Sequence, residues 1–145
     1  MVDVHVETVI NKPQDHVAAY AGNPDNAPQW YSNIKSVKWQ TQPPMAVGSK
    51  LAFSARFLGR TLDYVYEIIE LLPGQRLVMR TAQGPFPMET TYAWTPEGSS
   101  STRMVLRNTG SPSGFSKLAG AVMAPMMRRA MRKDLRKLKE LLESS

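Results

Sequence analysis

The sequence predicts an α+β fold, in which one antiparallel sheet is covered by a long C-terminal helix. An alternating apolar pattern begins the chain, a succession of alternating segments fills its middle, and an amphipathic segment ends it. The connections between the middle segments are too short to hold crossover helices, so neighbouring strands should run antiparallel. We therefore expect a seven-stranded antiparallel sheet, with two short helices after the first strand.

The N-terminal segment predicts one strand and the two short helices. Apolar residues alternate with polar ones over residues 2–10, as in a half-buried strand. Asn11 and Gln14 then have the spacing of a capping box, and Gly22 is a suitable helix stop. A second short helix is expected within residues 23–31.

Six further strands are expected between Ile34 and Asn108, where clusters rich in Gly and Pro separate the alternating segments. Because successive side chains of a strand point to opposite faces, the alternation assigns each residue to a face. One face is apolar, aromatic and rich in methionine. The other carries the charged residues, which include Asp63, Glu67, Arg80, Glu89 and Arg107.

Composition limits the chemistry that the chain can carry. Its 145 residues are typical of a single domain, which we place at residues 1–145. The absence of cysteine excludes disulfides and thiolate metal sites, and His5 and His16 lack the spacing of a metal-ligand pair on one helix. We expect no metal and no cofactor. Neither a signal peptide nor a membrane-spanning segment is visible, so we expect a cytoplasmic protein.

Several segments, taken in order, resemble the SRPBCC superfamily. They are "VINKPQDHVAAYAGNPDNAPQWYSNI", "VGSKL", "YVYEIIELLPGQRLVMRT", "PFPMETTYAW", "STRMVLRN" and "KDLRKLKELLE". This superfamily includes the START and birch-pollen-allergen-like domains, and the chain is most similar to its polyketide cyclase/dehydrase-type branch. The resemblance implies a helix-grip fold, in which a curved sheet wraps around the long C-terminal helix and leaves a cavity between them.

The C-terminal helix carries two apolar arcs, displaced from each other by roughly a third of a turn at 100° per residue. The first comprises Phe115, Leu118, Ala119, Val122 and Met126, and the second comprises Met127, Met131, Leu135, Leu138 and Leu142. One straight helix cannot aim both arcs at the same sheet, and Pro125 lies between them. We therefore expect a kink or break within residues 121–125, with the first half covering the cavity mouth.

The ligand-binding residues that we expect lie on the apolar face of the sheet and on the first arc of the helix. They are Phe53, Phe57, Tyr64, Tyr66, Met79, Met88, Tyr92, Trp94, Met104, Leu118, Val122 and Met126. From the residues alone a filled core is the more frequent outcome of such a pattern, whereas the resemblance favours a cavity. Thr90 and Asn108 add polar groups on the same face.

No catalytic residue can be assigned, because the titratable side chains of the strands are expected to point outward. The sequence therefore favours binding of a small hydrophobic molecule, such as a lipid, an isoprenoid or an aromatic polyketide-like compound. The alternative is an aromatase/cyclase or dehydratase that uses the same pocket. A charged side chain among the inward positions would favour the enzyme, and a wholly neutral lining would favour the carrier.

The outer face of the C-terminal helix is strongly basic, with seven Lys or Arg between Arg128 and Lys139 in a chain of net charge +6. A solvated surface is the simplest interpretation. Transient contact with a membrane surface is the second, and a regulatory module that binds RNA or protein is the least favoured. The sequence does not indicate an oligomeric state.

Overall fold

The computed structural model describes residues 2–57, 59–84, 87–111 and 117–144. Its elements follow the order expected from the sequence. They are β1 (Val2–Ile10), α1 (Gln14–Ala21), the 3-10 helix η1 (Pro24–Asn26), α2 (Ala27–Trp30), β2 (Ile34–Trp39), β3 (Lys50–Phe57), β4 (Arg60–Leu72), β5 (Arg76–Gln83), β6 (Met88–Pro96), β7 (Thr102–Gly110) and α3 (Lys117–Glu143).

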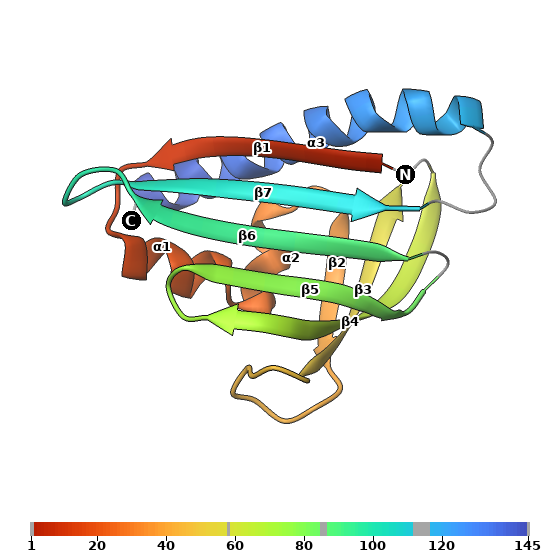
Figure 1. Ribbon diagram of the computed structural model, residues 1–145, viewed down its shortest axis with the longest axis horizontal. Helices are drawn as coiled ribbons and strands as arrows, with labels where there is room; N and C mark the ends of the chain where they lie inside the picture. Colours follow the sequence, from red (N-terminus) through yellow and green to blue (C-terminus); the bar gives the residue numbers. More distant parts are fainter. Residues whose placement is uncertain (1, 58, 85–86, 112–116, 145) are drawn as a thin grey trace.

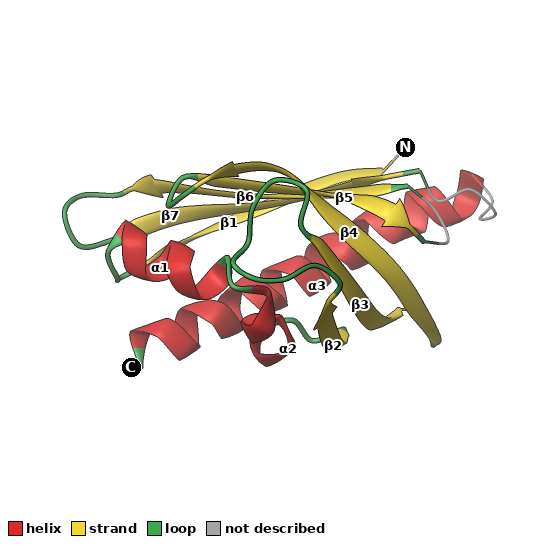
Figure 2. Cartoon of the chain, turned by 90° about the horizontal axis from the view of Figure 1, so that it is seen from below, coloured by secondary structure: helices red, strands yellow, loops and turns green. Residues whose placement is uncertain are grey.

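All seven strands form one antiparallel sheet in the order β1-β7-β6-β5-β4-β3-β2, which confirms the predicted fold (Figure 1). The strands from β2 to β7 are neighbours in sequence order, whereas β1 pairs with β7 from Val2↔Gly110 to Ile10↔Thr102. The register shifts twice between β4 and β5, which marks irregularities of the kind that bend a sheet. The helices lie on one side of this curved sheet (Figure 2).

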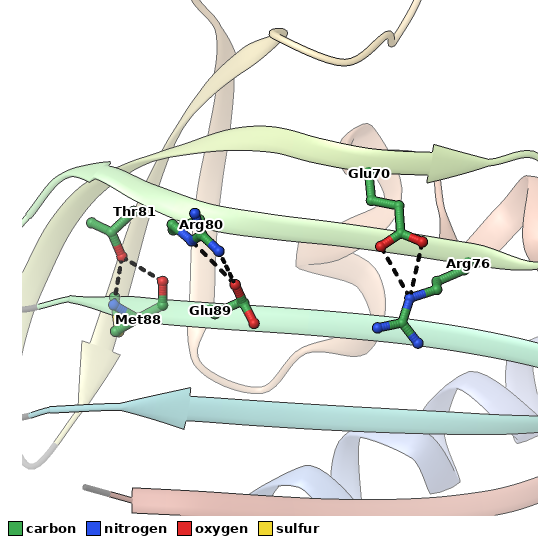
Figure 3. A network of polar contacts seen from close by, with 6 residues as sticks. All are labelled: Glu70, Arg76, Arg80, Thr81, Met88 and Glu89. Carbon is green, nitrogen blue, oxygen red and sulfur yellow. Dashed lines mark hydrogen bonds and ion pairs between the residues drawn. The ribbon is translucent and has the colours of Figure 1, made fainter.

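The two faces of the sheet carry the residues that the alternation assigned to them. Leu51, Ile68 and Leu106 point inward and are completely buried. On the outer face, cations and acids of adjacent strands pair directly, as Arg80 does with Glu89 at 2.9 Å (Figure 3). Because these pairs are exposed, each stabilises the fold by at most about 1 kcal/mol.

The start of α1 differs from the expected capping box. Pro13 occupies the N-cap position and no side chain caps the helix, so the box is wrong. Gln14 is instead half-buried, and its Nε2 donates to the backbone carbonyls of Gly74 at 2.8 Å and Trp94 at 3.1 Å. Gln14 therefore ties α1 to the sheet, and Gly22 ends the helix as expected.

Helix α3 continues without interruption through Pro125, so a break within residues 121–125 is wrong, whereas a kink there stays a prediction. The reason for the continuity is that one buried stripe runs along the part of α3 whose side chains are described. Met123, Met127, Met131 and Leu138 follow one another at helical spacing and contact the sheet or the cavity. Pro125 lies on the exposed side of the helix. None of the helices in the described part of the chain has the length and hydropathy of a bilayer-spanning segment.

Candidate functional site

A half-enclosed cavity of about 160 Å³ lies between the inner face of the sheet and α3. A cavity of about 150 Å³ holds a benzene ring, so this space accepts roughly one aromatic ring. The lining residues come from all seven strands, from the segment after α2 and from α3. They are Val2, Tyr31, Asn33, Ile34, Phe53, Ala55, Arg56, Leu62, Tyr64, Tyr66, Met79, Met88, Thr90, Tyr92, Asn108, Thr109, Gly110, Met123, Met127, Ala130, Met131 and Asp134.

Aromatic and methionine side chains account for ten of the 22 lining residues. Phe53 stacks on Tyr64 with ring centroids 5.5 Å apart, and Tyr66 meets both rings edge-on at 5.6 and 5.0 Å. Opposite the sheet, α3 contributes Met123 and Met127. Methionine side chains are flexible and polarisable, so they adapt to apolar molecules of different shapes. The wall is suited to a flat apolar molecule.

One carboxylate interrupts this apolar wall. Asp134 of α3 is only 3% exposed, and its Oδ1 accepts a hydrogen bond of 2.9 Å from the backbone N–H of Ser32. No Lys or Arg of the described residues lies within ion-pair distance of it. Burial raises the pKa of the Asp134 carboxyl, and hydrogen bonds from Ser32 and the charge of Lys133 offset part of that effect. Asp134 is therefore a buried acceptor that forms no ion pair within the described residues.

The raised pKa of Asp134 predicts how the stability depends on pH. The folded state holds this proton more tightly than the unfolded state, so the stabilisation is present below the ordinary carboxyl pKa and is lost as the pH rises through the raised value. Asp134→Asn imitates the uncharged form. We expect this variant to be more stable than the parent protein near neutral pH, on the order of 1 kcal/mol.

Urea unfolding of both proteins at acid and neutral pH tests this expectation. The difference between them should shrink towards acid pH, where the parent carboxyl is also uncharged. The exposed Asp63→Asn is the matched control and should show no such trend. An Asp134→Asn variant that is less stable than the parent at every pH would contradict the prediction.

Two phenols lie beside Asp134. The hydroxyl groups of Tyr31 and Tyr92 are 2.7 Å apart, and the rings pack around the buried Trp30 at centroid distances of 4.1 and 5.8 Å. Burial raises the pKa of both phenols well above the ordinary value. Both therefore stay protonated at physiological pH, and they can donate hydrogen bonds but cannot act as bases.

A second group of hydrogen-bonded polar side chains comes from strands β4, β6 and β7. The Thr90 hydroxyl donates to Asn108 Oδ1 at 2.6 Å, so it accepts from the Tyr66 hydroxyl at 2.8 Å. Burial raises the pKa of Tyr66 to about 12. These neutral groups satisfy one another and form a polar patch on the sheet side of the cavity. Within the described residues, no cluster of three or more acidic or His side chains could hold a metal ion.

Six of the residues expected from the sequence line this cavity: Phe53, Tyr64, Tyr66, Met79, Met88 and Tyr92. Met104 is completely buried in the core, and Trp94 lines a different hollow beside α1. Met126 points to solvent with 42% of its surface exposed, because the helix turns Met123 and Met127 inward instead. The side chains of Phe57, Leu118 and Val122 lie outside the described part of the chain.

The sequence did not single out Asp134 or Tyr31. Asp134 stands within the basic run of α3, yet it lies seven residues after Met127 and four before Leu138, and so on the buried face. That spacing could have predicted that Asp134 is buried. Tyr31 immediately follows α2, where the chain has no helical or strand periodicity from which the direction of the side chain could be predicted. Asp134 is therefore a charged side chain among the inward positions, and it comes from the helix rather than from a strand.

Comparison with known proteins is consistent with this architecture. A Thermus thermophilus protein superposes with a TM-score of 0.83 at 20% identity, covering 98% of this chain and 97% of its own. The ZhuI aromatase/cyclase of a Streptomyces species gives 0.81 at 13% identity, with 97% and 93% coverage. A START superfamily protein of Mycobacterium smegmatis gives 0.71 at 16% identity, with 98% and 94% coverage. At these identities the likeness shows the fold alone.

No curated protein is significantly similar to the chain in sequence. A family model, described as polyketide cyclase / dehydrase and lipid transport, matches residues 1–143, which is nearly the whole length. The structures that share the fold include both an aromatase/cyclase and a START protein. The chain therefore belongs to the polyketide cyclase/dehydrase and lipid transport family, within the SRPBCC superfamily.

Proposed function

We propose that the protein binds a small aromatic molecule that carries a hydroxyl group, within the cavity between the sheet and α3. The observation that supports this most directly is the Asp134 carboxyl, which is the buried charged group of a cavity whose other charged lining residue, Arg56, is exposed. A hydrogen-bond donor of the ligand would satisfy this acceptor. Tyr31 and Tyr92 share one hydrogen bond, so the phenol whose proton is not used in it could donate to the same oxygen of the ligand.

The rest of the cavity supports an aromatic rather than a long-chain ligand. Its volume of about 160 Å³ is near that of a single ring and well below the roughly 300–1,000 Å³ of typical drug-sized pockets. The rings of Phe53, Tyr64 and Tyr66 offer both faces and edges for stacking. A bound ring system larger than one ring would extend towards the open side of the cavity.

The proposal can be tested with β-naphthol and its methyl ether. The ether has a methyl group in place of the hydroxyl hydrogen, so it cannot donate a hydrogen bond. A hydrogen bond to a charged group contributes about 1.5–3 kcal/mol, so β-naphthol should bind roughly 10- to 100-fold more tightly. The affinities can be measured by fluorescence titration or calorimetry. Equal affinity for the two compounds would contradict a role for a donor group, and the absence of binding by both would contradict an aromatic ligand.

Asp134→Asn should remove most of this preference. An amide at this position keeps one oxygen for the Ser32 N–H but replaces the second acceptor with a donor. Affinity for β-naphthol should therefore fall, while affinity for the methyl ether should stay the same or rise. Asn108→Leu, which alters the neutral polar patch instead, is the matched control and should keep the preference.

A charged side chain among the inward positions is the feature that favours an enzyme over a carrier, and Asp134 has that feature. The second candidate function is therefore a dehydratase or cyclase. Its carboxylate could take a proton from the carbon beside a ligand carbonyl, which breaks the C–H bond and leaves an enolate. Tyr31 or Tyr92 would donate a hydrogen bond to the enolate oxygen. The same proton could then pass from Asp134 to a β-hydroxyl group, which leaves as water while the enolate collapses to a conjugated ketone.

This second function can be tested apart from binding, with the β-hydroxy ketone formed from benzaldehyde and acetone. Dehydration yields benzylideneacetone, whose conjugation gives an absorbance signal. Turnover that Asp134→Asn abolishes would support the enzyme. Binding of β-naphthol without any turnover of such ketones would leave the carrier as the function.

A further inference from the structure

Four cations of α3 form a basic stripe, which we define as Arg129, Arg132, Lys133 and Arg136. Their spacing of three, one and three residues places them on one side of the helix, opposite the buried stripe that includes Met131 and Leu138. All four are exposed. The stripe therefore lies on the outer side of α3, whose position on one side of the sheet is seen in Figure 2.

The four cations of the basic stripe have no acidic partner among the described residues, unlike several cations of the sheet. Arg80, Arg103 and Arg107 of the sheet each pair with an acid at 2.9, 2.9 and 2.7 Å. On α3 itself, Lys139 pairs with Glu143 at 2.6 Å. None of the four stripe residues forms an ion pair with any acid of the described residues. Their charge is not neutralised within the part of the chain that the structure describes.

An apolar side chain lies next to the basic stripe. Met126, 42% exposed, is three residues before Arg129 and therefore close to it on the helix surface. A helix that presents cations together with an exposed apolar residue is typical of segments that lie on a bilayer surface. Nucleic-acid binding usually adds aromatic side chains that stack on bases, and the stripe contains none.

We propose that the basic stripe of α3 binds the surface of an anionic lipid bilayer, with the helix lying along the surface and Met126 contacting the acyl boundary. The four unpaired guanidinium and ammonium groups complement lipid phosphates, and attraction to an anionic surface acts through each of them. Met123 and Met127 of the same helix line the cavity, so the bound membrane would lie next to the cavity wall. This inference does not depend on the identity of the cavity ligand.

Flotation of the full chain with lipid vesicles tests the proposal. Vesicles of phosphatidylcholine alone are compared with vesicles in which part of it is replaced by phosphatidylglycerol. The protein should float with the anionic vesicles only, and added salt should release it. Arg129→Gln combined with Arg132→Gln should weaken vesicle partitioning by about fivefold for each charge removed.

The matched control is Lys38→Gln combined with Lys50→Gln, which removes two exposed positive charges from β2 and β3 instead. Partitioning of this control should equal that of the parent protein, and unfolding midpoints would verify that both variants are folded. The proposal is overturned by equal losses in the two double variants, or by no preference of the parent for anionic vesicles. It is also overturned if the Arg129 and Arg132 changes reduce binding to single-stranded RNA while leaving vesicle binding intact.

Discussion

Replacing Leu138 with alanine should lower the free energy of unfolding by about 3–5 kcal/mol. Leu138 is completely buried on the face of α3 that packs against the sheet, so the truncation removes a whole isobutyl group from the core. The loss combines the transfer free energy of the deleted carbons with the cost of the cavity left behind. Since small proteins are stable by only about 5–15 kcal/mol, the variant should be close to unfolding at body temperature.

Urea denaturation followed by circular dichroism would measure this effect. Leu72→Ala is the matched control, because the same atoms are deleted from a leucine that is 47% exposed. Leu72→Ala should lower the free energy of unfolding by less than about 1 kcal/mol. A loss below about 1 kcal/mol for Leu138→Ala would mean that α3 does not supply the centre of the core, and the packing described above would be wrong.

Filling the cavity from α3 should abolish ligand binding without unfolding the protein. Ala130 lines the cavity, and Ala130→Phe would add a ring of about the size that the space of about 160 Å³ accepts. Because the new ring occupies the proposed place of the ligand, affinity for β-naphthol should fall at least about 100-fold. Stability should be unchanged or higher by about 0.5–2 kcal/mol, as for other cavity-filling substitutions.

Fluorescence titration and thermal unfolding of the same preparation separate the two effects. Glu140→Phe adds the same ring to an exposed position of α3 and should bind β-naphthol like the parent protein. If Ala130→Phe binds normally, the ligand site lies elsewhere. If it is strongly destabilised, the cavity is already filled by side chains in solution, and the proposed site is wrong.

Local periodicity determined much of the fold. Alternation alone placed Phe53, Tyr64 and Tyr92 on the inner face and Arg80 on the outer face, since period two fixes side-chain direction wherever a strand is regular. The short connections fixed the antiparallel arrangement. What alternation could not supply was the pairing of β1 with β7, which joins segments about 100 residues apart through contacts that leave no local signature.

The candidate site was predicted less completely, because a cavity depends on curvature rather than on the direction of side chains. Met104 and Met79 both point inward, yet only Met79 reaches the open space. A similar limit applies to Met126 and Met127, whose orientation depends on how α3 rotates against the sheet. The proline between the apolar arcs suggested a break, and tertiary packing instead kept the helix continuous with Pro125 on its exposed side.

Local sequence pattern was enough to predict the α+β class, the faces of the strands, the amphipathic C-terminal helix and the family resemblance. The burial of Asp134 near Tyr31 and Tyr92 follows instead from the packing of α3 against the sheet. The polar group of the site combines a helix residue, a residue that follows a helix and a strand residue. Burial, and with it the raised pKa of the carboxyl, arises only when the sheet curves around α3.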